Sequence, residues 1–365
     1  MLKRNISFRH EIFDCLRGVA IFLVFVNHIP YNDYLLNDET PILIRKFFLS
    51  GTYGVQLFYI VSAATLLISL NFRKETNFLN FYLRRLFRIV PIFYLGIIIH
   101  ILYFSFNNNY NFDLVTLENI FQNIFFINNI IPPSNDLILG GSTIATEMNF
   151  YLILPVIFLI INTYIKSLFF SFFCLIMILI FNNYSPSLFF EKSFGDINFY
   201  RTIFSQIYVF SLGICFFQIH KNTLLNFSEM DSRSIIVKII PFIILSIIIV
   251  VFNKQEPEYF YFRNMFLVST LFFISINIFF NLIKYFNSNF LFKFFVNLGK
   301  ISFSMYILHW ITIHFSWEVL QHLEYFEFFI IFFIIISFLF TYVCSYFFAK
   351  LEYYFINIGK KFLNS

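Results

Sequence analysis

Apolar stretches of about 18 residues or more recur along almost the whole of this chain. A helix of that length crosses the roughly 30 Å hydrocarbon core of a lipid bilayer. Because no water is available at that depth, the backbone must satisfy its own hydrogen bonds, and helices are the expected spanning form. The recurrence of these stretches argues against a water-soluble fold and predicts an all-α integral membrane protein.

The composition agrees with this prediction and argues for one domain. Hydrophobic residues make up 59% of the 365 residues and charged residues only 12%, against about 25% charged residues in soluble domains. We expect a single transmembrane domain over residues 1–365, with no additional soluble domain. The expected partners therefore include the lipid bilayer but no nucleic acid. The apolar stretches predict about ten spans, near 11–29, 47–70, 87–106, 147–163, 166–182, 202–219, 235–252, 262–283, 301–320 and 325–348.

The positions of Lys and Arg predict how these spans are oriented. With the N-terminus inside, 18 of these residues fall in inner segments and 6 in outer segments, and Arg17 lies within the first span, which accounts for all 25. Cytoplasmic loops carry the excess of positive charge, so we expect both termini in the cytoplasm. The long outer loop 107–146 fits either a functional lid or a solvated linker. Its apolar part, 119–131, predicts an interfacial or re-entrant segment.

Three ionisable residues of the first predicted span are candidates for function, because a charge at membrane depth is costly and marks a candidate functional site. Arg17 and His28 are eleven residues apart, which places them on nearly the same helix face and about 16 Å apart along the axis. Asp14 precedes Arg17 by three residues and can pair with it. A juxtamembrane ion pair and an interfacial histidine would also explain these residues, but a shared polar stripe favours function.

The chemistry of these side chains indicates what such a stripe could do. Histidine is the natural general base near neutral pH, and the guanidinium fork of arginine suits phosphate or thioester oxygens. Together they suggest a donor that enters from the cytosol and a hydroxyl that is activated further out. The four cysteines lie in apolar stretches without metal-ligand spacing, so we expect neither a disulfide nor a metal site.

Six motifs in order resemble the acyltransferase-3 family of membrane acyltransferases. The first three are FDCLRGVAIFLVFVNH at 13–28, GTYGVQLFYIVSA at 51–63 and FYLRRLFRIVP at 81–91. The last three are STIATEMNFYLILP at 142–155, LGKISFSMYILHW at 298–310 and AKLEYYFINIGKK at 349–361. The chain departs from the family pattern with Ala63 for Gly, Ser142 for Trp, and no Pro after Glu352. The resemblance covers nearly the whole chain.

The resemblance implies an enzyme of the bacterial inner membrane. Such an enzyme transfers an acyl group, most often acetyl from cytosolic acetyl-CoA, to a hydroxyl of an envelope glycan such as O-antigen, capsule or exopolysaccharide. Acetyl-CoA would then be a substrate, and no permanently bound cofactor is expected. The acceptor, a glycan or lipid-linked glycan, would be handled by the membrane domain or by a separate partner protein.

Residue roles are carried over from the resemblance as hypotheses. We expect His28 to deprotonate the acceptor hydroxyl or to orient the thioester carbonyl. Glu147 would fix the His28 tautomer or pair with a cation. Arg17, Arg85 and Arg88 would hold the donor, although the last two also fit simple positive-inside anchors. Glu147 could equally cap a helix, and His309 could equally be a packed core residue. The remaining matched positions are expected to support the site: Asp14, Ser62, Tyr151 and His309.

Two other functions fit parts of the sequence. A transporter or flippase for a lipid-linked sugar or small anion would also use buried Arg and His residues. Its sequence signature would be inverted repeats or paired broken helices, and neither is evident. A membrane sensor or scaffold would not need the stripe of Arg17 and His28. An acyltransferase is therefore the favoured reading.

Overall fold

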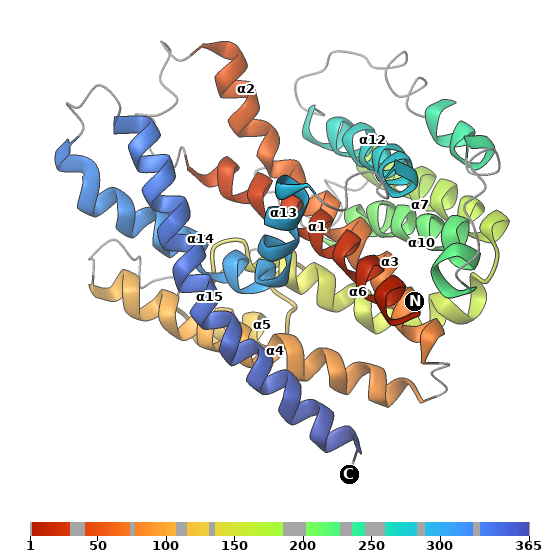
Figure 1. The fold of residues 1–365 in the computed structure, drawn as a ribbon, viewed down its shortest axis with the longest axis horizontal. Helices are drawn as coiled ribbons and strands as arrows, with labels where there is room; N and C mark the ends of the chain where they lie inside the picture. Colours follow the sequence, from red (N-terminus) through yellow and green to blue (C-terminus); the bar gives the residue numbers. More distant parts are fainter. Residues whose placement is uncertain are drawn as a thin grey trace.

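The computed structural model describes residues 2–29, 41–73, 77–106, 115–130, 136–184, 202–226, 236–244, 260–282, 289–323 and 329–364. These residues are almost entirely helical and contain no strand, which confirms the predicted all-α class. The first half of the chain contributes α1 (Leu2–His28), α2 (Ile42–Ser50), η1 (Gly51–Tyr53), α3 (Gly54–Phe72), α4 (Phe78–Phe106), α5 (Leu117–Ile124), α6 (Gly141–Ile160) and α7 (Tyr164–Tyr184). The second half contributes α10 (Ile203–Asn226), α12 (Phe260–Leu282), α13 (Phe290–Lys300), α14 (Ser302–Leu320), η5 (Gln321–Leu323) and α15 (Phe329–Asn364) (Figure 1).

Several of these helices are long and apolar enough to cross a bilayer. Among the described residues there are five, and a sixth if α13 and α14, which meet at an angle of 81°, form one broken span. The five are Ile44–Phe72, Phe78–Phe106, Gly141–Ile160, Ile203–Leu224 and Phe329–Leu363. Ten spans therefore stay a prediction. The expected span 235–252 lies mostly outside the described residues.

The first helix runs through the middle of the bundle (Figure 1). It packs most extensively against α13 and next against α3. The contact with α13 depends on two glycines, because a Cβ atom at Gly18 would meet the carbonyl of Phe295 and one at Gly299 would meet the carbonyl of Asp14. Small residues of this kind let two helix backbones approach closely in a membrane. The site residues of α1 are thus held by backbone-to-backbone packing.

The helix α13 was not predicted from the sequence, which placed residues 284–300 in an inner segment. Asn289 caps it by accepting a hydrogen bond from the amide of Leu291 (3.0 Å). Its buried face includes Phe292 and Val296, while Lys293 and Lys300 are exposed. With only eleven residues it is too short to signal a span, so its basic residues were assigned to a loop.

The helices α14 and α15 pack against each other, and both contact α4. The long C-terminal helix α15 packs along both α14 and α4 (Figure 1). Prolines lie inside α4 (Pro91) and α6 (Pro155). The packing of α15 on α4 brings Arg88 of α4 next to Glu352 of α15.

Part of the predicted outer loop 107–146 is folded against α6. The short helix α5 occupies the apolar stretch, and Thr116 caps it by accepting from the amide of Asn119 (3.1 Å). Asp136 accepts from the side chain of Asn128 (2.8 Å) and from the amide of Ser142 at the start of α6 (3.0 Å). The described part of the loop therefore packs against the first turn of α6.

Candidate active site

A polar cavity of about 80 Å³ lies within the helix bundle. Its walls come from α1, α3, α4, α6 and the beginning of α14. Six residues named from the sequence line it: Arg17, Ser62, Arg85, Arg88, Glu147 and Tyr151. Residues from four different predicted motifs are thus brought into one enclosure, together with Thr65 and Tyr306, which had no assigned role.

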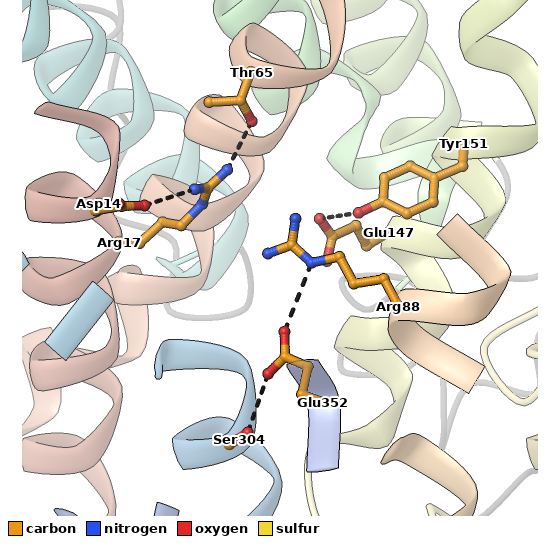
Figure 2. A network of polar contacts seen from close by, with 8 residues as sticks. All are labelled: Asp14, Arg17, Thr65, Arg88, Glu147, Tyr151, Ser304 and Glu352. Atoms are coloured by element: carbon orange, nitrogen blue, oxygen red, sulfur yellow. Dashed lines mark hydrogen bonds and ion pairs between the residues drawn. The ribbon is translucent and has the colours of Figure 1, made fainter. Parts of the chain in front are cut away.

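Arg17 is held from two sides. Its Nη1 lies 3.2 Å from the carboxylate of Asp14, one turn earlier in α1, so the pair expected from the spacing is present. Its Nη2 donates to the hydroxyl of Thr65 in α3 at 2.9 Å (Figure 2). Two bonds from one planar group fix the orientation of Arg17, which lines the cavity.

Arg88 is paired with the last helix of the chain. Its Nε lies 3.8 Å from a carboxylate oxygen of Glu352 in α15. The other oxygen of Glu352 accepts from the hydroxyl of Ser304 at 3.1 Å (Figure 2). Glu352 is 6% exposed, and a buried carboxylate needs such partners. The sequence marked Glu352 only as part of a motif, and its partner could not be found without the packing of α15 on α4.

Glu147 joins α6 to α3. Its carboxylate accepts from the hydroxyl of Ser62 and, at 2.6 Å, from the hydroxyl of Tyr151 one turn further along α6. Both hydroxyl groups line the same cavity. Figure 2 shows this carboxylate beside the guanidinium of Arg88.

Arg85 completes the set of cations. Its guanidinium lies 5.8 Å from the centroid of the Phe81 ring, a favourable cation–π distance. Its Nε is buried and has no hydrogen-bond partner within the described part of the chain. Three guanidinium groups and one carboxylate line the cavity, those of Arg17, Arg85, Arg88 and Glu147. Two further carboxylates, Asp14 and Glu352, pair with Arg17 and Arg88.

His28 lies at the end of α1 and is not among the residues that line this cavity. Its Nδ1 is 2.8 Å from the carbonyl oxygen of Val24 and 3.1 Å from Nε2 of His309. Its ring also stands against Trp310, with centroids 4.4 Å apart. His28 and His309, named separately from the sequence, are thus in contact. The predicted link from Glu147 to His28 has no counterpart among these contacts, since Glu147 bonds Ser62 and Tyr151.

Tyr306 lies between the cavity and the histidine pair. Its side chain lines the cavity and donates to the carbonyl of Gly140 at 3.0 Å. Its own carbonyl accepts from Nδ1 of His309 at 2.7 Å. Gly140 has a positive φ of 84°, which glycine adopts without strain. The loop before α6 is thereby tied to the helix that carries His309.

Other histidines and the cysteines lie elsewhere. His220 is within 2.8 Å of the side-chain oxygen of Asn277, and His314 is within 3.0 Å of the hydroxyl of Tyr103. The four cysteines are free thiols. Among the described residues no group of three His, Cys, Asp or Glu residues could hold a metal ion.

Comparison with known proteins gives one match. The family model of the acyltransferase-3 family, described as an acyltransferase domain, matches residues 10–350. No curated protein and no solved structure matches the chain.

Proposed function

The chain belongs to the acyltransferase-3 family, and from that premise we propose that it is a membrane-bound O-acetyltransferase. It transfers acetyl from cytosolic acetyl-CoA to a hydroxyl of an envelope glycan, in the inner membrane of a bacterium. The observation that carries the proposal is the charged cavity between apolar helices. Three arginines line one cavity, and two of them, Arg85 and Arg88, lie in a helix long and apolar enough to span a membrane. Charges in such a place are costly to keep unless they bind a substrate.

The arginines suit the anionic part of the donor. Arg17 and Arg88 are each oriented by a carboxylate, and the buried Nε of Arg85 has no partner among the described residues. Phosphate oxygens bind guanidinium groups through short, charge-assisted hydrogen bonds. Asp14 and Glu352 keep the cations neutralised when the donor is absent, so we assign the three arginines to donor binding.

His28 is the base of the proposed reaction. The imidazole takes the proton of the acceptor hydroxyl as its oxygen attacks the thioester carbonyl carbon, and the thiolate of coenzyme A leaves. Arg17 and His28 are about 16 Å apart along α1. This separation suits an extended donor whose phosphates lie at one end and whose thioester lies at the other.

Of the two roles expected for Glu147, we assign it the pairing with a cation rather than the orientation of His28. It bonds Ser62 and Tyr151 and lies beside the arginines rather than beside His28. We assign it to the electrostatic balance of the donor cavity, where its negative charge holds guanidinium groups in place.

Membrane vesicles test the function. Vesicles that contain the wild type or His28→Ala at equal abundance receive labelled acetyl-CoA and host envelope glycan. His322→Ala, a change at an exposed histidine, serves as the matched control. Base-labile label on the glycan with the wild type and the control, but not with His28→Ala, is the expected result. Substrate flux without any covalent change would contradict it and favour a transporter.

A further inference from the structure

The contact between the two histidines defines which nitrogen of each ring carries its proton. His309 is fully buried, and its Nδ1 lies 2.7 Å from the carbonyl oxygen of Tyr306. A carbonyl oxygen only accepts, so Nδ1 of His309 is the protonated nitrogen. Nε2 of the neutral ring then has a lone pair and can only accept a hydrogen bond.

The same reasoning applies to His28 and gives a consistent result. Its Nδ1 lies 2.8 Å from the carbonyl oxygen of Val24 and 3.1 Å from Nε2 of His309. Both neighbours are acceptors, so Nδ1 of His28 carries the proton and shares it between them. The lone pair of His28 is therefore on Nε2, the nitrogen on the far side of the ring.

We propose that His309 is a positioning residue that holds His28 in the tautomer with a basic Nε2. This inference rests on the proposed function, in which His28 takes the proton of the acceptor hydroxyl. The contacts with Val24 and His309 fix the ring from the Nδ1 side, and Trp310 stands against its face at 4.4 Å. When His28 becomes an imidazolium, the lone pair of His309 remains beside its Nδ1–H and stabilises the positive charge.

This assignment gives a physical reason for a histidine at position 309. A base in an enzyme is commonly oriented by a third group, and a carboxylate is the usual choice. A neutral imidazole supplies the same acceptor without adding a charge among apolar helices. His309 in turn is oriented by a backbone carbonyl of its own helix, so no further ionisable group is needed.

Two substitutions of His309 separate positioning from simple packing. Glutamine places an amide oxygen near the position of Nε2, so His309→Gln keeps an acceptor for His28 but loses the bond to Tyr306. Asparagine places its amide near the position of Nδ1, so His309→Asn keeps a donor for Tyr306 but leaves nothing for His28. The proposal predicts that the Gln variant is active and that the Asn variant is not.

The measurement is the rate of acetyl transfer to host envelope glycan at saturating labelled acetyl-CoA, together with the dissociation constant for acetyl-CoA. His309→Asn is expected to lower kcat by about 10-fold or more, with the range of about 10- to 100-fold known for partners that orient metal-bound histidines as the guide. Its affinity for acetyl-CoA should stay unchanged, which also shows that the variant is folded. His309→Gln should transfer at nearly the wild-type rate, as should the control His322→Gln.

The other outcomes overturn the inference. An active Asn variant beside an inactive Gln variant would mean that His309 only anchors Tyr306. Equal activity of both variants, or loss of activity in both with acetyl-CoA binding intact, would show that its acceptor nitrogen has no part in orienting His28. Absence of transfer by the wild type itself would overturn the proposed function, and this inference with it.

Discussion

At the scale of residues, two of the three cations of the cavity have an orienting partner. Asp14 and Thr65 hold Arg17, and Glu352 holds Arg88. A charge placed among apolar helices is tolerated when it is paired and hydrogen-bonded. If the arginines bind the donor as proposed, the same partners restrict the guanidinium groups beforehand, which reduces the ordering that binding requires.

Substitutions of Arg88 distinguish its pairing from its binding role. Arg88→Ala leaves Glu352 buried without its cation and should lower the free energy of unfolding by about 1–3 kcal/mol. The loss is smaller than for a fully buried ion pair because the side chain of Arg88 is 37% exposed. Arg88→Lys keeps the charge but not the planar fork. It should retain the thermal midpoint and raise KM for acetyl-CoA. Equal stability of the Ala variant and the wild type would refute the pairing role.

The hydroxyl of Thr65 gives a second residue-level prediction. Thr65→Val keeps the shape of the side chain but removes the acceptor of Arg17. A hydrogen bond to a charged group contributes about 1.5–3 kcal/mol, so KM for acetyl-CoA should rise about tenfold or more. The kcat should change little, since Thr65 contacts Arg17, the arginine that we propose binds the donor. A fall in kcat at constant KM would be inconsistent with this assignment.

At the scale of elements, α1 and α13 depend on close backbone approach. Gly299→Ala places a methyl group against the backbone carbonyl of Asp14, so one helix must move. Overpacking of this kind costs about 1–3 kcal/mol, and the shift displaces the helix that carries Arg17. We expect a lower thermal midpoint and lower transfer activity.

Gly141→Ala is the matched control for that substitution. A Cβ at this position would meet its nearest neighbour, a side-chain atom of Ile138, at 3.7 Å, which is an ordinary contact. The thermal midpoint should therefore stay at or above the wild-type value. If the two glycine variants lost equal stability, the close contact of α1 with α13 would not be the cause.

Helix positions were partly predictable from the apolar runs. The expected span 301–320 corresponds to Ser302–Leu320, and 87–106 corresponds to the later part of Phe78–Phe106. The earlier start of α4 was missed because its first turns contain Arg84, Arg85 and Arg88, which interrupt the apolar pattern. The helix α13 was missed because it is short and its exposed face is basic.

The pairs of residues that contact each other from different helices were less predictable. The pair of Asp14 and Arg17 follows from spacing within one helix, and it is present. The contact of His28 with His309 and the pairing of Arg88 with Glu352 join residues more than 250 positions apart. Such contacts depend on how helices pack, and local sequence carries no signal for them.

At the scale of the whole molecule, the proposed reaction requires one defined orientation of the protein in the membrane. Within α1, Arg17 lies nearer to the cytoplasm than His28, provided that the N-terminus is cytoplasmic. Reporter fusions at both termini test this orientation. An alkaline phosphatase fusion should be inactive and a fluorescent protein fusion bright at either end. Active phosphatase at either terminus would contradict the predicted topology.

The central claim is that acetyl passes from a cytosolic donor to a glycan hydroxyl on the other side of the membrane. The most direct measurement uses purified protein in liposomes, with labelled acetyl-CoA on the side of the termini and host envelope glycan on the opposite side. The account predicts base-labile label on the glycan, and none when acetyl-CoA is supplied only on the side of the glycan. Labelling that is independent of the side of the donor, or no covalent labelling of the glycan, would contradict it.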